Sequence, residues 1–431
     1  MDPCQKLRDE VKEAEEKYDA LSGLTEGGKP MPGAAGALQN LDNKKAALQA
    51  CIKAHTPFII TGDTPEPGTA LTQFDKTMEN FFRINGVRAG QLTILKGGVK
   101  KFEHAYTLSY PPYPTTQVDS LFRIASVSKA FTCGAIQTLL DQNKLKLNET
   151  VFPLVGITHK AVASQNPDPR INNITVDHLV GHLGGFNDQG TGKFWEAGKP
   201  VPSTFDPVFN IRNIAINMNL TRPPTKMDVA RYMFGEPLQF TPGGPITGTD
   251  GKKTFAYSNF GYVLLGLVVE KKSGMPYIDF VRQQVLAPIG VTDVYLARML
   301  SGPIPREVSY DDAGSGLNAL EPHANVTAPK PWGGFGAVTD LMDSGGGLVA
   351  HATAIARYVN RFMAWGRGHG RGGARSGEMS GTAAWAQSID DIDFSFTLNT
   401  STFPAKRVFP TDSIDKDNLA SMLQASFSAL K

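Results

Sequence analysis

The first 58 residues place their hydrophobic side chains at helical spacing. A 3-4-3-4-3 spacing, typical of an amphipathic or coiled-coil-like helix, joins Cys4, Leu7, Val11, Ala14, Tyr18 and Leu21. After a Gly- and Pro-rich break, a second such face begins with Leu38, Leu41, Leu48 and Ile52. We expect residues 1–58 to form an N-terminal helical hairpin that packs on the main domain or on a partner, with homo-oligomerisation through it as an alternative role.

From about residue 70 the pattern becomes that of a mixed domain. Residues 71–85 have the spacing of an amphipathic helix, and residues 90–110 read as two strands joined by Lys-Gly-Gly. Residues 381–400 alternate as two further strands with Asp-Asp at the turn, and residues 417–430 read as a last helix. Strands at both ends with helices between them predict an α+β fold, in which distant segments close an antiparallel sheet flanked by helices.

The middle of the chain supplies the helices. Residues 259–290 read as two helices around a Ser-Gly turn, and residues 343–366 as a Gly-rich turn into another helix. Residues 140–250, rich in Pro, Asn and Gly, are expected to form a mostly helical subdomain inserted in a domain spanning 70–430. Three of its aromatic side chains could line an apolar acyl site or pack in the core, and we expect packing: Phe194, Trp195 and Phe205.

Composition narrows the classes of partner. The chain of 431 residues has 43 basic and 41 acidic side chains, and this near balance gives no general attraction to nucleic acid or anionic lipid. No apolar run approaches the roughly 18 to 20 residues that a membrane span needs. Residues 1–20 are charged and lack an apolar core, so no signal peptide is expected in the chain as given.

Two weak features favour a secreted protein. Cys4 and Cys51 lie near ends that antiparallel helices would bring together, so a disulfide there is one reading and two free thiols the other. An excess of N-x-S/T sequons points the same way, with acceptors at Asn148, Asn173, Asn219, Asn325 and Asn399.

Candidate chemistry begins in "LFRIASVSKAFTCGAIQTLL", residues 121–140. On a helix, positions i and i+3 share a face, so Ser126 and Lys129 point the same way while Ser128 points elsewhere. Serine needs a base within hydrogen-bond reach, and a desolvated lysine beside it can serve. The alternative is a helix-capping serine with a solvated lysine, because S-x-x-K alone is a weak signal. Tyr257 and Asn259, just before another predicted helix, could add a phenol and an amide to the same pocket.

Several segments, in order, resemble the serine β-lactamase and penicillin-binding protein superfamily. They are "FRIASVSKAFT", "ITVDHLVGHLGGF", "YSNFGYVLLGLVVEKKSGMPYIDFVRQQVLAPIGV" and "SGGGLVAHATAIARYVNRF". The resemblance covers roughly residues 70 to 405 and fits the class C-like branch, which includes family VIII carboxylesterases and D-amino-acid peptidases and amidases. It implies a β-lactamase-like fold, with Ser126 as the acylated serine, Lys129 as the motif lysine, and Tyr257 and Asn259 as the second motif.

The third motif departs from the family pattern. The family usually has Lys or His, any residue, then Gly, whereas the best match here is Arg375-Ser376-Gly377, with His369 as the alternative. Arg375 could bind a substrate carboxylate but cannot exchange protons near neutral pH. The oxyanion hole that the resemblance implies uses the backbone N–H groups of Ser126 and Glu378.

These features together predict a serine hydrolase without metal or cofactor. His178 and His182 share a helix face but have no third ligand at suitable spacing, so no metal site is expected. The expected substrates are small-molecule carboxylic esters first, amide or D-peptide bonds second and β-lactams third. The alternative of another class is a non-catalytic or assembly-forming relative that uses its N-terminal hairpin.

Overall fold

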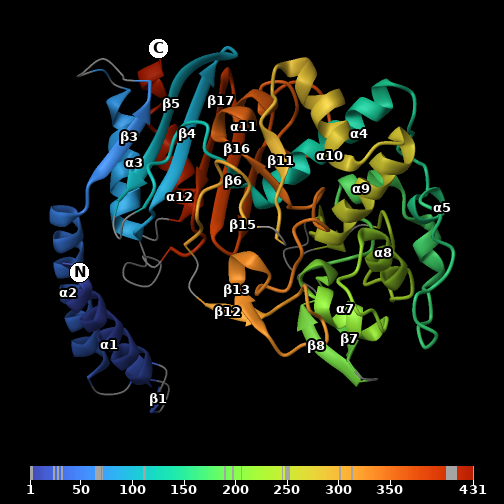
Figure 1. Ribbon diagram of the computed structural model, residues 1–431, viewed down its shortest axis with the longest axis horizontal. Helices are drawn as coiled ribbons and strands as arrows, with labels where there is room; N and C mark the ends of the chain where they lie inside the picture. The colour runs from blue at the N-terminus through green and yellow to red at the C-terminus, as the bar shows by residue number, and fades with distance from the viewer. Residues whose placement is uncertain are drawn as a thin grey trace. The chain divides into compact units, whose positions relative to one another are not determined.

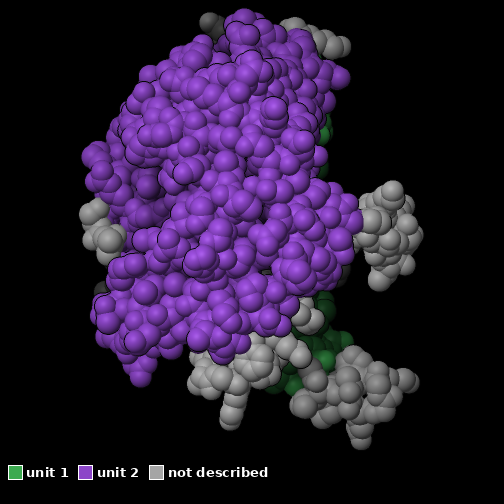
Figure 2. Space-filling view, turned by 90° about the vertical axis from the view of Figure 1, so that its right-hand side faces the viewer, with its two compact units in different colours: residues 1–90, 104–117, 402–431 green, residues 91–103, 118–401 purple. Residues whose placement is uncertain are grey.

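The computed structural model separates the chain into two compact units, coloured separately in Figure 2. Unit 1 comprises residues 1–90, 104–117 and 402–431, and unit 2 comprises residues 91–103 and 118–401. The structure describes residues 3–22, 25–26, 29–30, 33–63, 69, 71–109, 113–188, 191–196, 199–204, 206–244, 246–247, 253–299, 302–311, 314–403 and 415–430. The domain boundaries expected from the sequence, 1–58 and 70–430, stay a prediction.

Unit 1 contains the helical hairpin that the heptad-like spacing predicts. Helices α1 (Gln5–Ser22) and α2 (Ala34–His55) pack through a small apolar core that includes Val11, Ala14 and Leu41. A disulfide joins Cys4 to Cys51 and closes the hairpin, which settles the choice between a bridge and free thiols. The short strands β1 (Thr25–Glu26) and β2 (Lys29–Pro30) lie between the helices in sequence and pair with each other.

The remainder of unit 1 holds helices α3 (Thr72–Asn85) and α12 (Lys416–Gln424) and strand β3 (Phe58–Gly62). Phe58 of β3 stacks on Tyr106 with 5.7 Å between ring centroids and meets Phe82 of α3 edge-on at 5.6 Å. Gly86 ends α3 in the left-handed conformation, at φ 67°, which glycine adopts without a Cβ clash.

A six-stranded sheet has the order β15-β16-β17-β4-β5-β3, so strands from both ends of the chain lie side by side (Figure 1). Its strands, besides β3, are β4 (Ala89–Lys96), β5 (Val99–Leu108), β15 (Ala374–Met379), β16 (Thr382–Ile389) and β17 (Ile392–Leu398). The β15–β16, β16–β17 and β3–β5 pairs are antiparallel, and Asp390 takes φ 51° at the tight turn before β17. The predicted α+β fold is therefore confirmed.

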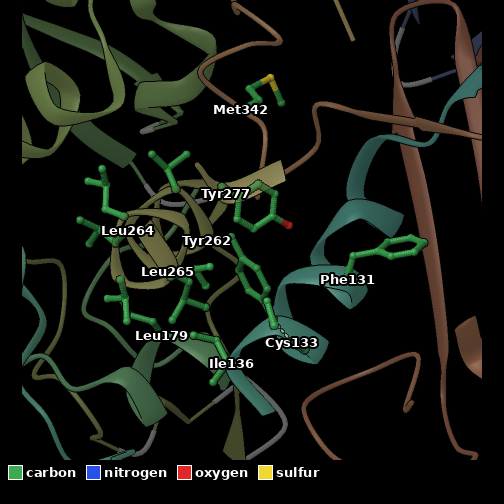
Figure 3. Close-up of a cluster of buried hydrophobic side chains, with 14 of the residues drawn as sticks. Phe131, Cys133, Ile136, Leu179, Tyr262, Leu264, Leu265, Tyr277 and Met342 are labelled. Atoms are coloured by element: carbon green, nitrogen blue, oxygen red, sulfur yellow. Dashed lines mark hydrogen bonds between the residues drawn. The ribbon is translucent and has the colours of Figure 1, made fainter. Parts of the chain in front are cut away.

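Two buried helices form the centre of unit 2. Helix α4 (Ser128–Asp141) lies beside α9 (Asn259–Ser273), and Tyr262 reaches from α9 to within 3.3 Å of the Sγ of Cys133 (Figure 3). Gly274 caps α9 at φ 71°, where the sequence predicts the turn, and α10 (Tyr277–Phe280) and the π-helical turn η4 (Val281–Leu286) follow. Because both helices are apolar on nearly every face, neighbouring elements must cover them.

Short elements complete unit 2. The expected helical subdomain, residues 140–250, holds helices α5 (Val151–Leu154), α6 (Val176–Val180), α7 (Ile211–Asn217) and α8 (Lys226–Phe234). It also holds the paired strands β7 (Thr191–Glu196) and β8 (Lys199–Thr204), and β9 (Ile246–Thr247) near its end pairs with β10 (Lys253–Thr254). Strands β12 (Ser315–Leu317) and β13 (Thr327–Pro329) pair later in the chain, and α11 (Ala352–Val359) precedes β15. The side chains of Phe194, Trp195 and Phe205 lie outside the described residues.

A three-stranded sheet that the sequence did not predict supports the nucleophile segment. Strand β14 (Leu348–Ala350) lies between β6 (Phe122–Arg123) and β11 (Val294–Leu296). The backbone N–H of Ile124 also donates to the carbonyl of Leu348 over 3.0 Å. Among the described helices, none has the length and apolarity that a membrane crossing requires.

Candidate active site

Ser126 lies in a tight turn between a strand and a helix. Strand β6 ends at Arg123, a single 3-10 turn η1 (Ala125–Val127) follows, and α4 begins at Ser128. Ala125 takes φ 44°, a conformation rare for residues other than glycine, and such strain is frequent beside functional groups. Ser126 therefore precedes the α-helix, whereas the sequence placed it within a helix.

Two side chains converge on the hydroxyl of Ser126. The Nζ of Lys129 donates to its Oγ over 3.0 Å, and the phenol of Tyr257 donates to the same atom over 2.8 Å. The i, i+3 relation thus brings Ser126 and Lys129 together as expected. Ser128 faces away, and its Oγ accepts a hydrogen bond from the backbone N–H of Leu348 over 3.2 Å. This hydrogen bond links the start of α4 to β14.

Lys129 is fully buried and its ammonium meets three acceptors. Besides Ser126, Nζ donates to the Oδ1 of Asn259 over 2.6 Å and to the backbone carbonyl of Gly345. Three N–H groups against three acceptors satisfy an ammonium completely. The Nζ also lies 5.0 Å from the ring centroid of Tyr257, so the positive charge lies beside the phenol that contacts the nucleophile.

Asp188 and Asp206 hold Asn259 from two sides. The Nδ2 of Asn259 donates to the Oδ2 of Asp206 over 2.7 Å, and its backbone N–H donates to the Oδ2 of Asp188 over 2.5 Å. The backbone N–H of Asp188 donates in turn to the carbonyl of Tyr257 over 2.9 Å. Neither acid was predictable from the sequence, because neither belongs to a local motif.

The two carboxyl groups are buried and near each other. Burial raises the pKa of Asp188 well above its ordinary value, and the charge of Asp206 raises it further. Burial also raises the pKa of Asp206, against the lowering effect of its hydrogen bond from Asn259. Such a pair avoids a second buried negative charge by retaining a proton.

The ring of His182 stacks on the ring of Tyr257. The two rings stack with 4.6 Å between centroids and 24° between planes. The Nδ1 of His182 accepts a hydrogen bond from the backbone N–H of Ser258 over 3.1 Å, so the neutral ring carries its proton on Nε2. Burial, and then the charges of Arg375 and Lys129, lower the pKa of His182 to about 2.

The second histidine of the sequence pair has a different role. The Nδ1 of His178 accepts from the backbone N–H of Thr175 over 3.3 Å in the capping box of α6. His178 thus caps its helix, while His182 lies against Tyr257. Within the described residues, one group of potential metal ligands comes together, Cys4, Cys51 and His55, and the disulfide already joins its two sulfur atoms.

The third-motif segment forms strand β15, which lies against the nucleophile turn. A Cβ on Gly377 would lie 2.2 Å from the carbonyl oxygen of Ile124 and 2.9 Å from the backbone nitrogen of Ser126. Only glycine permits this approach of two backbones. Glu378, the next residue, is exposed at this point of the strand.

Arg375 is on the same face of β15 as Gly377 but is 2% exposed. Its Nε donates to the carbonyl of Ala364 over 2.9 Å, and its Cζ lies 4.3 Å from the ring centroid of Trp365. Neither Nη1 nor Nη2 has a hydrogen-bond partner among the described residues. The rival His369 is exposed and contacts Asp141, with 2.6 Å between Nε2 and Oδ2.

Known proteins resemble this chain in sequence. A family model described as "Beta-lactamase" matches residues 74–400. Penicillin-binding protein 4* of Bacillus subtilis is 28% identical over 193 residues, which are 42% of this chain and 32% of the relative. The D-alanyl-D-alanine-carboxypeptidase/endopeptidase AmpH of Escherichia coli is 25% identical over 229 residues, which are 53% of this chain and 50% of the relative. The chain thus spans about a third to a half of these two curated relatives.

Solved structures share the fold. The octameric penicillin-binding protein homologue from Pyrococcus abyssi has a TM-score of 0.54 at 17% identity, over 84% of this chain and 78% of that chain. The D-amino acid amidase from Ochrobactrum anthropi SV3, complexed with L-phenylalanine, has a TM-score of 0.53 at 17% identity, over 83% of this chain and 98% of that chain.

Proposed function

The chain belongs to the β-lactamase family, and its relatives include a penicillin-binding protein and a D-alanyl-D-alanine-carboxypeptidase/endopeptidase, so we propose that Ser126 is its nucleophile and forms an acyl-enzyme. The observation that carries the proposal is the convergence of Lys129 Nζ and the Tyr257 hydroxyl on a single oxygen, at 3.0 and 2.8 Å. An unactivated serine is a weak nucleophile, and two proton-transfer groups at hydrogen-bond distance are what its activation requires.

The reaction proceeds in two halves. For the reaction one of these two groups must be deprotonated, either Tyr257 as phenolate or Lys129 as neutral amine. Oγ of Ser126 attacks the carbonyl carbon, and its proton passes to that group. Backbone N–H groups of Ser126 and Glu378 stabilise the oxyanion, and the leaving group takes the proton as its bond to carbon breaks. A water molecule then attacks the acyl carbon and gives a proton to the same base, which passes a proton to Oγ of Ser126 as the ester bond breaks and the acid is released.

The substrate class we propose is carboxylic esters, with D-aminoacyl amides or peptides second. A carboxypeptidase needs a cation for the free carboxylate of its substrate. Arg375 is 2% exposed and contacts the ring of Trp365, so it offers poor access to such a carboxylate, which favours neutral esters. The similarity to a D-amino acid amidase supports the second class.

Covalent labelling tests the nucleophile. We expect a fluorophosphonate probe to add one adduct mass to the intact protein, and Ser126→Ala to lose it. Ser128→Ala is the matched control and should keep the adduct, since its hydroxyl contacts Leu348. No adduct on the wild type would overturn the proposal in favour of a non-catalytic relative. An adduct that persists in Ser126→Ala would overturn it by placing the reactive nucleophile at another residue.

Kinetics with two substrate series then separate the classes. p-Nitrophenyl esters of increasing chain length are compared with D-aminoacyl p-nitroanilides by kcat/KM. We expect the esters to be preferred, and a higher kcat/KM for the D-anilides would select the amidase reading. Tyr257→Phe should lower kcat by about 10²- to 10⁴-fold on either series, because it removes a proton-transfer group.

We also propose an extracytoplasmic location and, through the hairpin of residues 1–58, self-association. The Cys4–Cys51 disulfide supports an oxidising compartment. Light scattering of the full chain measures the mass in solution, and a monomer at every concentration would contradict self-association.

A further inference from the structure

Unit 2 contains a cavity of about 490 Å³ whose lining includes no residue of the catalytic site. Most of its lining residues come from α10, η4, β11 and the segment around residue 305. The full lining is Leu121, Ile278, Arg282, Tyr295, Leu296, Arg298, Ile304, Pro305, Arg306 and Asp340. Its size falls within the roughly 300 to 1,000 Å³ of sites that bind small molecules.

Three arginines come to this cavity from three different segments. Arg282 of η4 lies over the ring of Tyr295, with 4.9 Å from Cζ to the centroid. Arg298 lies two residues after the end of β11, and its carbonyl accepts a hydrogen bond from Nη2 of the buried Arg123 over 3.3 Å. These contacts fix the position of both segments.

The third arginine is held most firmly. Arg306 takes φ 69° and donates to Asp119 and Asp293 over 3.2 and 3.3 Å. Its carbonyl accepts a hydrogen bond from the backbone N–H of Leu121 over 2.8 Å. A positive φ in a residue other than glycine or asparagine is a strained conformation, which the surrounding contacts maintain.

The positive charge is only partly neutralised. Ion pairs within the described part of the chain include Arg306 but neither Arg282 nor Arg298. Asp340 is the single acid of the lining, so the cavity has three arginines and one carboxyl group. Guanidinium groups suit phosphate or carboxylate oxygens, which they bind in pairs, and arginines from separate elements line this cavity.

The remaining wall is apolar. It is made by Leu121, Ile278, Leu296, Ile304 and Pro305. An inorganic anion would contact the arginines and leave this wall exposed to water, whereas an anion with a hydrocarbon portion would cover both.

We propose that this cavity binds an amphipathic organic anion, with a phosphate or carboxylate group at Arg282 and Arg298 and a short hydrocarbon portion on the apolar wall. The ligand is a second molecule, distinct from the substrate at Ser126. This proposal does not depend on the hydrolase activity, since none of the lining residues takes part in it.

Calorimetric titration of the full chain with hexyl phosphate tests it. We expect saturable binding at one site, tighter than for inorganic phosphate and absent for hexanol. Arg282→Gln/Arg298→Gln should weaken binding by at least about tenfold, since each lost charge-assisted hydrogen bond costs about that factor. Both side chains are exposed, so the double variant should fold, and its p-nitrophenyl ester hydrolysis should be unchanged.

Matched controls distinguish specific binding of hexyl phosphate in the cavity from its general attraction to positive charge. Arg231→Gln removes an exposed arginine of α8, far along the chain from the cavity, and should bind hexyl phosphate as the wild type does. Labelling Ser126 with the fluorophosphonate should also leave binding intact. The proposal is overturned by equal binding of inorganic and hexyl phosphate, by equal weakening in both arginine variants, or by loss of binding on labelling.

A last experiment distinguishes binding of a free ligand from binding of a lipid headgroup. The protein is sedimented with vesicles of phosphatidylglycerol, and with phosphatidylcholine vesicles as control. Binding of hexyl phosphate without co-sedimentation is the expected result. Co-sedimentation with no binding of hexyl phosphate would replace the small ligand by a membrane surface and overturn the proposal.

Discussion

Asp206 fixes the orientation of the Asn259 amide. The Nδ2 of Asn259 donates to Oδ2 of Asp206 over 2.7 Å, and the opposite end of the same amide, Oδ1, accepts from Lys129 over 2.6 Å. An amide with N and O exchanged would present a donor to the ammonium and an acceptor to the carboxyl. The Asp206 contact therefore selects the rotamer that holds Lys129 beside Ser126.

We expect Asp206→Ala to lower kcat by about tenfold to a hundredfold with little change in KM, because it disturbs the base without touching the acyl pocket. Asp206→Asn keeps one acceptor oxygen for Nδ2 and should recover most of the loss. Ester hydrolysis over a range of pH measures both variants. An Asp206→Asn variant as slow as Asp206→Ala would show that the charge, and not the amide orientation, matters.

The site also depends on the close approach of Gly377 to the backbone of the nucleophile turn. A Cβ there would lie 2.2 Å from the carbonyl oxygen of Ile124, which is backbone and cannot move aside as a flexible side chain can. Gly377→Ala should therefore push β15 away from Ser126 and lower kcat/KM by a factor of a hundred or more, together with a lower Tm. The oxyanion donor proposed at Glu378 would move with the strand.

A second glycine provides the control. Gly36 lies within α2, and a Cβ on it would meet no heavy atom within 4 Å. Gly36→Ala should keep full activity and stabilise the helix by about 0.5–1 kcal/mol. Unchanged kcat/KM in Gly377→Ala would place β15 farther from the nucleophile than the structure does.

Local sequence patterns predicted the elements with strong periodicity and clear turns. Helix α3 and the hairpins β4–β5 and β16–β17 agree with the expected segments, because alternation and Gly-Gly or Asp-Asp turns encode them directly. Strand β14 is only three residues long and follows a run of glycines, so no period could be read from it. The helical hairpin was predictable, while the disulfide required the geometry.

The residues of the candidate site were likewise predictable only in part. Spacing alone paired Ser126 with Lys129, but the positive φ of Ala125 has no signature in the sequence. Asp188 and Asp206 come from a Pro- and Asn-rich region, and only the tertiary fold brings them to Asn259. Such residues are invisible to a local pattern because their partners lie more than fifty positions away.

The disulfide predicts how unit 1 responds to reduction. It closes a loop between residues 47 apart in sequence, and the chain-entropy argument gives a contribution of about 4 kcal/mol. Cys4→Ser/Cys51→Ser should therefore lower the transition temperature of the hairpin in calorimetry while ester hydrolysis is retained, since the residues proposed for catalysis belong to unit 2. Dithiothreitol should reproduce the shift in the wild type and add nothing in the variant.

Thiol counting checks the state of the bridge directly. In denaturant, the unreduced protein should show one reactive thiol, from Cys133, and the reduced protein three. Three thiols before reduction would mean that the bridge is not formed in the isolated protein.

His182 predicts a loss of stability in acid. Its pKa is lowered to about 2 in the folded chain, against about 6.5 in the unfolded chain. Between these values the unfolded chain binds a proton that the folded chain does not, so the free energy of unfolding falls as the pH drops below 6.5. By pH 5 this contribution amounts to about 2 kcal/mol relative to pH 8.

His182→Asn isolates the effect, since asparagine tolerates the φ of 56° at this position but does not titrate. The variant loses the ring stacked on Tyr257 and should be less stable than the wild type at pH 8. Between pH 8 and pH 5 that difference in the free energy of unfolding should shrink by about 2 kcal/mol, because only the wild type carries the acid-labile histidine.

Urea unfolding at both pH values measures this difference. His369→Asn removes an exposed histidine and is the control, because it distinguishes the effect of a buried histidine from the loss of any imidazole. A difference that stays constant with pH would mean that His182 takes up its proton in the folded protein, and that its contact with Tyr257 survives an imidazolium.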